Sequence, residues 1–292
     1  MANSITKFTK YVPLLDEVYK LGSFTSVLDS DPTLARAGAN ANEICIPKLA
    51  LTGLGDYSRN SGYVTGSATL TYQTVQYNYE RGVRLNIDAM DNEETGGLLL
   101  GKMSSEFVRT KVAPEVDAFR FATYAGTASI GKVSTAAALS TGAEWLAAIR
   151  AGNTVMDNAE VPMESRYLFL TATGKGLIDD LDTTVSRAVM GGFAAVVVVP
   201  QTRFYTAIDL YDGTTDGETA GGYVKNSSAH NINFMIIEKS ALIQYPKHVV
   251  DKVISPEVNQ DYDGYSIYYR NYGLADVHDN KVAGIYLHDA NA

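Results

Sequence analysis

The segment from Asp88 to Ala125 places the strongest constraint on the fold of this chain. It begins with acidic residues and continues with apolar residues at about the 3.6-residue spacing of one buried helix face. The apolar residues that we predict to form the core of this helix are Leu100, Met103, Phe107, Val112, Val116 and Phe119. A helix of about 25 residues is roughly 37 Å long, so the sequence predicts an elongated molecule with a structural spine.

The charged residues of the same segment occur as neighbours of opposite sign. These pairs are Lys102/Glu106, Lys111/Glu115 and Asp117/Arg120. Residues three or four apart meet on a helix surface, so we expect these pairs on the solvent side. Pro114 removes a backbone donor and crowds the preceding turn, which predicts a bend or a restart of the helix.

Two regions precede this helix. Residues 1–43 are predicted to be an N-terminal arm, because a short amphipathic stretch is followed by residues without a core-forming period. Residues 44–87 are predicted to be an extended two-stranded loop with a Gly/Ser/Asn-rich tip at 53–66 and a long return strand. Neither face of the return strand is clearly apolar, and a two-stranded ribbon alone is marginal in water. The loop therefore needs another surface to lie on.

The remaining regions alternate predicted helices and strands. Residues 88–132 comprise the spine helix and the start of a peripheral domain, and residues 133–245 form an α/β domain. In this domain a helix over 141–158 has the apolar members Trp145, Ile149, Val155 and Met156. The run AAVVVVP at 194–200 is predicted to be a fully buried strand, and residues 211–231 a polar loop. Residues 246–278 are expected to be closing strands of the peripheral domain, and 279–292 a C-terminal strand and tail.

A family resemblance is carried by the order of these features. The acidic beginning, the long amphipathic helix and APEVDAFRFA at 113–122 resemble the spine helix of tailed-bacteriophage major capsid proteins with the Hong Kong phage capsid fold. The C-terminal third contributes INFMIIEKSALIQYPK at 232–247 and DGYSIYYRNYGLADVHDNKVAGIYLH at 263–288. The resemblance implies an α+β fold with an N-terminal arm, an extended loop, a spine helix, a peripheral domain and an α/β axial domain.

The resemblance also implies a function. The chain would be a structural subunit, not an enzyme, that self-assembles into hexamers and pentamers of an icosahedral bacteriophage capsid. The shell would need no cofactor and would enclose DNA without sequence-specific binding. We expect it in the virion, assembled in the host cytoplasm with a portal and a separate scaffold protein. A separate scaffold is expected because only about 45 residues precede the first strand of the loop.

The tip of the extended loop is the predicted contact with a neighbouring subunit. The residues expected there are Asp56, Tyr57, Arg59 and Tyr63. Some members of the family join a lysine of this loop to an asparagine of a neighbour. Residues 53–66 contain Arg59 and no lysine, and a guanidinium does not supply the uncharged amine that this reaction needs. We therefore expect no covalent cross-link between subunits.

Composition and charge limit the alternatives. Apolar residues make up 46% of the chain and charged residues 20%, as in globular proteins. The formal net charge of −9 makes the chain a poor general binder of phosphate backbones. The first 20 residues lack an apolar signal core, and the longest apolar run is far short of the roughly 20 residues that span a bilayer. We expect a soluble protein without a membrane association.

Three segments of the sequence partly match the patterns of known binding sites. Gly174-Lys175-Gly176 lacks the Ser/Thr and the first glycine of a phosphate loop. The run Asn259–Asp263 begins like a calcium loop but has no glutamate at the twelfth position. We therefore expect no nucleotide binding at the first motif and no metal site at the second. An acidic loop with Asp209, Asp212, Asp216 and Glu218 leaves cation binding open.

Two further features leave alternatives open. Cys45 is the one cysteine and is interpreted as a buried, inert thiol on a strand. The 19 tyrosines gather in 57–79 and 262–286, where they suit either a protein interface or a carbohydrate platform. The alternatives to a phage capsid are therefore the shell protein of a cellular nanocompartment and a carbohydrate-active enzyme.

Overall fold

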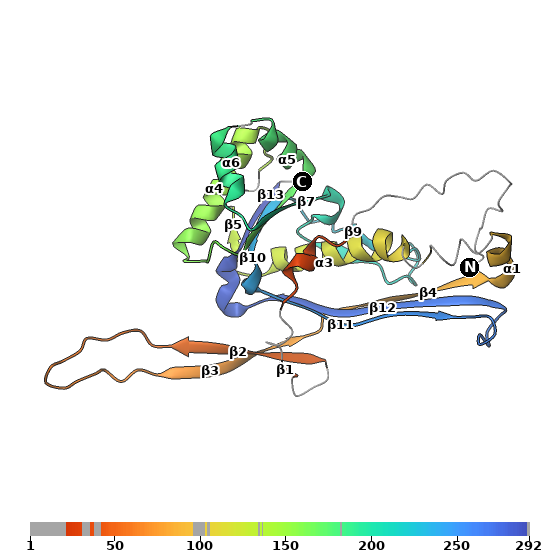
Figure 1. Cartoon of the computed structure of the whole chain (residues 1–292), viewed down its shortest axis with the longest axis horizontal. Coiled ribbons are helices and arrows are strands. Elements are labelled where there is room, and N and C mark those ends of the chain that lie inside the picture. Colours follow the sequence, from red (N-terminus) through yellow and green to blue (C-terminus); the bar gives the residue numbers. More distant parts are fainter. Residues whose placement is uncertain are drawn as a thin grey trace.

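Helix α3 (Ala113–Gly126) lies between two β-sheets at the centre of an elongated molecule (Figure 1). This computed structural model describes residues 22–30, 36–37, 42–95, 103, 106–133, 135, 137–181 and 183–290. A two-stranded hairpin extends from one end of the body, and a long sheet extends toward the other (Figure 1). Among the described residues, no helix has the length and apolar composition needed to cross a membrane.

The spine helix changes geometry next to Pro114. A π-helical turn, η3 (Val108–Val112), leads directly into α3, and the Ala113 N–H donates to the Val108 carbonyl five residues back. Pro114 has no N–H to give to the preceding turn, which accounts for the widened hydrogen-bond spacing at the predicted place. Helix α1 (Ala89–Glu94) is a separate short helix capped by the Asp88 carboxylate.

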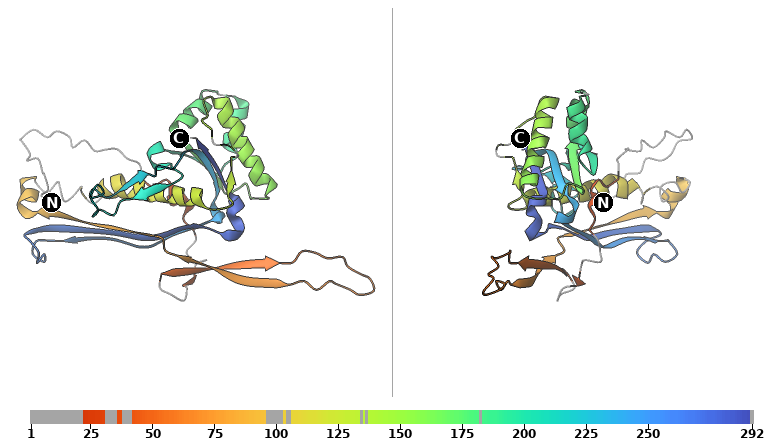
Figure 2. Two further views of the ribbon diagram at one scale, coloured as in Figure 1. Left: turned by 180° about the vertical axis from the view of Figure 1, so that it is seen from behind. Right: turned by 60° about the vertical axis from the view of Figure 1, so that its left-hand side comes forward.

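A five-stranded sheet lies on one side of α3. Its order is β5 (Gly131–Lys132), β13 (Ile285–Ala290), β10 (Asn231–Glu238), β6 (Arg166–Thr171) and β7 (Ala195–Val199). Side chains alternate between its faces, so Leu168 and Leu170 pack under helices while Phe169 contacts Phe121 of α3 at a ring distance of 5.3 Å. The covering helices are α4 (Gly142–Asn158), α5 (Ala172–Asp179) and α6 (Thr184–Gly191), which stand together on one face (Figure 2).

The structure corrects three details of this region. Val155 lies on the outer face of α4 and is 46% exposed, whereas Trp145 is buried as predicted. Strand β7 is an edge strand with β6 as its single neighbour, so Val199 is buried and Val196–Val198 are half-buried. The predicted loop over 211–231 contains β9 (Tyr223–Lys225), which pairs with β8 (Ile208–Leu210).

The sheet on the other side of α3, called the long sheet here, joins distant parts of the chain. It consists of β11 (Leu242–Ile254), β12 (Gly264–Val277) and β4 (Tyr79–Asp88), all antiparallel. The register of β11 shifts between Pro246 and His248, because proline cannot donate to the ladder. The predicted return strand is therefore two strands: β3 (Ala68–Gln76) pairs with β2 (Glu43–Leu51), and β4 belongs to the long sheet.

Residues 22–30, called the clasp here, fold into the body from the N-terminal side. They include a 3-10 turn, η1 (Thr25–Leu28), and the Leu28 side chain is fully buried in the core beneath the five-stranded sheet. The Gln244 side chain donates to the Thr25 carbonyl at 2.8 Å and to Asp29 at 2.6 Å. The clasp is thus tied to β11, and a short strand, β1 (Arg36–Ala37), follows it and pairs with β2.

The clasp surrounds a buried carboxylate of the spine helix. Asp117 is 0% exposed and accepts hydrogen bonds from the hydroxyl groups of Ser23 and Thr25 at 2.7 and 2.8 Å. Arg203, in η4 (Gln201–Arg203), donates to the other Asp117 oxygen at 3.0 Å. The expectation that Asp117 pairs with Arg120 on the solvent side is therefore wrong.

Glu115 departs from the same expectation. Its side chain is almost fully buried and accepts from Arg81 at 2.8 Å and from the Tyr79 hydroxyl at 3.1 Å. Burial, with the Glu115 carboxylate beside it, raises the pKa of Tyr79. Both partners lie on β4, so the acidic residue holds α3 against the long sheet.

Candidate intersubunit contact site

The base of the hairpin formed by β2 and β3 is anchored to the body of its own subunit. Ile44, Ile46 and Val75 are buried against Tyr245 and Leu274 of the long sheet. This small cluster supplies, within the same chain, the surface that a two-stranded ribbon needs to lie on. Anchoring fixes the direction in which the rest of the hairpin leaves the body.

A second set of contacts holds the base at its outer side. The Gln73 amide donates to the Val277 carbonyl at 3.2 Å, and its oxygen accepts from the Asp279 N–H at the same distance. Lys48 forms an ion pair with Asp279 at 3.3 Å. Cys45 lies at this end of β2 and is half-buried, with its sulfur 3.6 Å from Thr74, so the expectation of a buried thiol is wrong.

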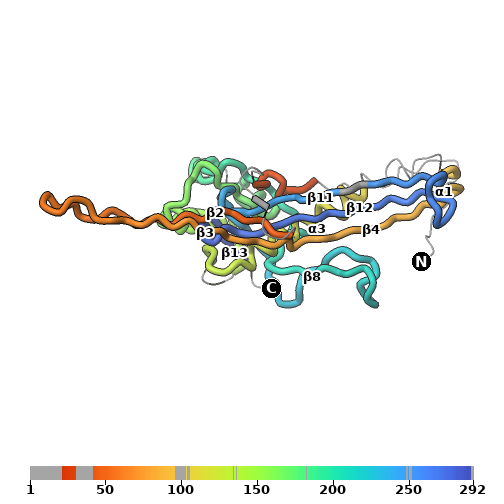
Figure 3. The backbone as a smooth tube through the Cα atoms, turned by 90° about the horizontal axis from the view of Figure 1, so that it is seen from below, coloured from red at the N-terminus to blue at the C-terminus, as the bar shows by residue number. Residues whose placement is uncertain are grey.

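Beyond this base the hairpin projects away from the body on its own (Figures 1 and 3). The exposed fractions of Leu49, Leu51 and Leu70 are 57%, 68% and 56%, so both strands carry apolar side chains into solvent. Isolated exposed apolar residues are ordinary, but a row of them on a projecting ribbon is typical of an interaction surface. The described residues of this subunit provide no cover for them.

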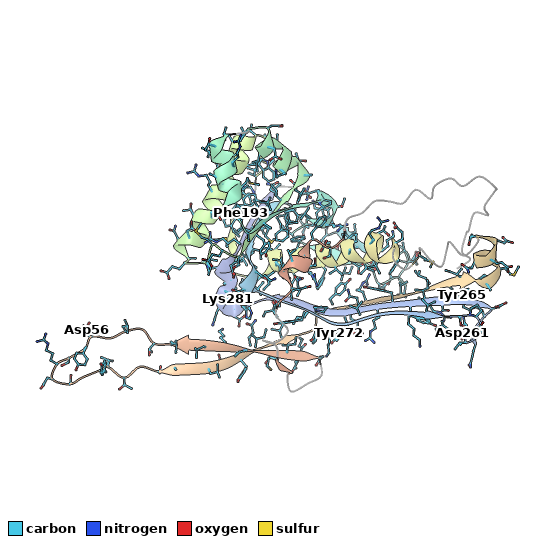
Figure 4. The ribbon with its side chains drawn as sticks, viewed as in Figure 1. Asp56, Phe193, Asp261, Tyr265, Tyr272 and Lys281 are labelled. Carbon is cyan, nitrogen blue, oxygen red and sulfur yellow. The ribbon has the colours of Figure 1, made fainter. Side chains whose placement is uncertain are left out.

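The tip of the hairpin, residues 53–66, brings the predicted contact residues together. Asp56, Tyr57, Arg59 and Tyr63 are all exposed, and Figure 4 shows Asp56 near the far end of the molecule. The rings of Tyr57 and Tyr63 meet edge to face at 4.8 Å. Gly62 takes a φ of +80°, which lets its backbone pair with Ser58 and turn the chain.

The predicted spine core occupies one of two packed faces of the helix. Met103, Phe107, Val112, Val116 and Phe119 are half-buried, and Leu100 lies outside the described residues. Phe107 packs on Tyr269 and Phe119 on Tyr79, so this face meets the long sheet. Phe121 and Tyr124 are fully buried on the other face, because α3 lies between two sheets and not on the surface of one.

The glycine-lysine motif forms part of a helix in the structure. Gly174 lies in α5 against the Trp145 ring, where an added Cβ would come within 2.4 Å of the indole. Lys175 forms an ion pair with Asp179 on the same helix. The glycine at 174 therefore allows two helices to pack closely.

Side chains of the two acidic motifs form ion pairs and hydrogen bonds within this chain. Asp261 pairs with Arg84 at 2.7 Å, and the Asn259 amide donates to the Gly264 carbonyl. In the loop after β8, Asp212 accepts from the Thr215 hydroxyl and backbone, and these bonds lower its pKa. Within the described part of the chain, no group of three or more His, Cys, Asp or Glu residues could hold a metal ion.

Comparison with known proteins identifies the architecture. No family model matches the sequence, and no curated protein matches it significantly. The solved asymmetric unit of the bacteriophage PhiM1 mature capsid is similar with a TM-score of 0.64 at 11% identity, covering 100% of this chain and 92% of that one. The capsid structure of the cyanophage P-SCSP1u gives 0.62 at 14% identity, with 98% and 93% covered.

A virus-like particle from Pyrococcus furiosus is similar to a lower degree. Its TM-score is 0.52 at 7% identity, and the match covers 84% of this chain and 86% of that one. The similarity to the two phage capsid structures covers nearly the whole of this chain and of each capsid chain. The chain has the α+β phage capsid fold that the resemblance in its sequence predicted.

Proposed function

We propose that this chain is the structural subunit of the icosahedral capsid of a tailed bacteriophage. The observation that carries the proposal is the projecting hairpin on a chain whose full length has the phage capsid fold. A hairpin anchored at its base and exposed along the rest of its length is suited to lie on another subunit. Its location would then be the virion.

The parts of the molecule support distinct roles in such a shell. We assign the five-stranded sheet with α4–α6 to the axial domain, and the spine helix with the long sheet to the peripheral domain. Identical subunits would form hexamers and pentamers by heterologous contacts that close into rings. Asp56, Tyr57, Arg59 and Tyr63 at the tip would contact the adjacent subunit, so that each subunit overlaps the next.

The charge of the chain supports enclosure of DNA without sequence-specific binding. A formal net charge of −9 disfavours general attraction to a phosphate backbone. The subunit would form a wall around the genome, assembled in the host cytoplasm with a portal and a separate scaffold protein. No cofactor or catalytic step enters this function.

The two alternatives have less support. The nanocompartment shell would share the assembly principle, but the likeness to the virus-like particle is weaker and covers less of each chain. A carbohydrate platform requires free tyrosine faces. In the long sheet the Tyr272 ring packs at a tilt on Tyr77 at 4.9 Å, with Lys247 over both rings. Tyr269 packs on Phe107, so these rings are used within the subunit.

Electron microscopy of negatively stained particles tests the proposal. The chain is expressed alone and together with the scaffold protein of its own genome, and both preparations are purified and imaged. We expect regular closed shells when the scaffold is present and irregular or open products without it. Uniform closed shells from the chain alone would contradict the need for a scaffold. Only small monomers in both preparations would contradict the capsid function.

A further inference from the structure

A pocket lies where the hairpin base, the long sheet and the end of the five-stranded sheet meet. Its volume is about 490 Å³, within the roughly 300–1,000 Å³ typical of pockets that enclose a ligand. We call it the junction pocket. Ile46, Leu242 and Tyr245 give it a buried apolar floor.

Three lysines surround the junction pocket. Lys48 comes from the hairpin, Lys239 from η5 (Lys239–Ala241) and Lys281 from η6 (Asp279–Gly284). Figure 4 shows Lys281 on the side of the body that faces the hairpin. Lys48 is paired with Asp279, whereas neither Lys239 nor Lys281 has a carboxylate within 4.0 Å in the described part of the chain.

Glu238 is the one carboxylate among the described residues that line the pocket, and it forms no ion pair with these lysines within 4.0 Å. Glu238 is 3% exposed, and its oxygens accept from Ser165 at 2.6 Å and from the Ser240 hydroxyl at 2.7 Å. Lys281 donates to the Ser240 carbonyl and hydroxyl, which fixes its position at the rim. Lys48, Lys239 and Lys281 thus stand against two carboxylates, Glu238 and Asp279, which leaves an excess of one positive charge in a chain whose net charge is negative.

The pKa of His278, which lines the pocket, reflects its burial and the charges around it. Burial lowers the pKa of this imidazole and the Lys281 ammonium lowers it further, while the Asp279 and Glu238 carboxylates act in the opposite direction. The imidazole is thus neutral at pH 7 and adds no charge of its own. The positive charge of the pocket comes from its lysines.

We propose that the junction pocket receives a carboxylate-bearing segment of a second copy of this chain. This proposal rests on the proposed capsid function and names a second contact besides the hairpin tip. The pocket begins at the hairpin base, so a subunit that lies along the hairpin also passes the pocket. A chain with 33 acidic and 24 basic residues presents excess carboxylates to its neighbours, and such charge complementarity guides partners into register.

Zero-length cross-linking tests the contact in the assembled protein. Equal amounts of unlabelled and nitrogen-15-labelled chain are assembled together and treated with a water-soluble carbodiimide. This reagent joins an amine to a carboxyl group in direct contact, with formation of an amide. We expect mixed-isotope peptides that link Lys239 or Lys281 to an Asp or Glu of another copy. Cross-links only within one copy, such as Lys48 to Asp279, would overturn the proposal.

Paired variants give a second readout. Lys239→Gln with Lys281→Gln removes two charges from the pocket, and Arg150→Gln with Lys111→Gln removes two charges from exposed positions outside it. We expect the pocket variant to lower the yield of closed shells about tenfold, since interface charges govern association, with the melting temperature of the unassembled subunit unchanged. The control variant should assemble like the parent.

The outcomes separate this proposal from the capsid function. If the parent forms shells and the pocket variant forms them equally well, the junction contact is wrong and the capsid function stands. If the parent with its scaffold forms no shells, both proposals fall. Cross-linking of the parent chain provides a decision even where the pocket variant folds poorly.

Discussion

The clasp at residues 22–30 and the hairpin tip at 53–66 both consist largely of small and polar residues, yet the clasp is packed into the subunit and the tip is exposed. Clasp hydroxyl groups donate to the buried Asp117, and Leu28 enters the core. The tip closes on itself through Ser58 and Gly62 and leaves Leu54 entirely exposed. The clasp packs into its own subunit, whereas the tip remains exposed and is the part that we propose to contact an adjacent subunit.

The difference teaches that composition does not decide whether a polar segment is buried. A buried polar group is tolerated when hydrogen bonds satisfy it, and Asp117 supplies the acceptor that the clasp hydroxyl groups and N–H groups need. The tip has no such acceptor within reach and satisfies its backbone locally. Each segment can be altered separately, and the expected effects on subunit stability differ strongly.

Removing the carboxylate at the centre of the clasp has the largest expected effect. Asp117→Ala removes the carboxylate that forms a buried ion pair with Arg203, whose side chain is 2% exposed. Breaking a buried ion pair from one side costs about 3–5 kcal/mol. Denaturant unfolding of the unassembled subunit measures the loss. Asp216→Ala, at an exposed position, serves as the control and should leave stability unchanged, and a loss below 1 kcal/mol for Asp117→Ala would mean that solvent reaches Arg203.

Truncating the apolar anchor of the clasp has the next largest effect. Leu28→Ala should lower the free energy of unfolding by about 2–4 kcal/mol, because the side chain is fully buried in the core. Val27 is the adjacent residue and is 42% exposed, so Val27→Ala is the matched control. Equal effects of the two variants in the same denaturant titration would show that the clasp is not seated in solution.

Alkaline pH should lower the free energy of unfolding of the subunit, because tyrosines that are buried next to the clasp and elsewhere in the body resist ionisation. Burial raises the pKa of Tyr124, whose hydroxyl donates to the Gln244 side chain that holds the clasp, and raises that of Tyr223 to about 12. The folded pKa lies above the ordinary value of 10.0, so the unfolded chain loses these protons first and stability falls as pH rises above 10. Each such tyrosine contributes about 1.4 kcal/mol per pH unit there.

The measurement is the denaturant midpoint between pH 8 and about 11.5, a range set by these tyrosine pKa values. Tyr124→Phe should reduce the steepness of the fall above pH 10, since one titrating group is removed. An unchanged slope would show that Tyr124 ionises equally in the folded and unfolded states.

Substitutions in the tip should affect assembly, whereas the stability of the unassembled subunit should hardly change. The double variant Tyr57→Ser/Tyr63→Ser removes one exposed ring pair, so the free energy of unfolding should change by no more than about 0.5 kcal/mol. The yield of closed shells, counted by electron microscopy, should nevertheless fall. Val185→Ser, on the exposed face of α6, is a control for loss of surface apolar area. Normal assembly of the tip variant would exclude these tyrosines from the contact.

The smallest expected effect is the absence of any covalent ladder. Particles boiled with detergent and reductant should give one band near 31.5 kDa on a denaturing gel, because the tip contains Arg59 and no lysine. A ladder of larger bands would locate reactive chemistry elsewhere in the subunit. Mass spectrometry of such bands would identify the residues that are joined.

Much of the architecture could be predicted from the sequence, because it depends on local patterns. The apolar period of α4, the run of β10 and the polar tip between β2 and β3 are signals within one element. The break between β3 and β4 escaped prediction, since the strand-like alternation continues through Tyr77 and Asn78 without a turn signature. Pairing with β12, almost 200 residues further along, decides where β4 begins.

The clasp could not be predicted for a related reason. Asp117 looks like a surface charge beside Arg120, and its true partners lie at Ser23, Thr25 and Arg203. One local sign was present: Asp117 shares a helix face with Phe121 and Tyr124, both apolar in character and both buried. A lone carboxylate on such a face indicates a buried partner from elsewhere in the chain.

Strand β13 has a consequence for the order of synthesis. It is the last strand along this sequence, yet it lies inside the five-stranded sheet between β5 and β10. Until residues 285–290 have left the ribosome, β10 presents an open, apolar edge that another chain could pair with. Translation that stops early would therefore yield aggregating fragments and no nearly finished subunits. Only chains that contain β13 would complete the five-stranded sheet, and the fold itself would perform this selection.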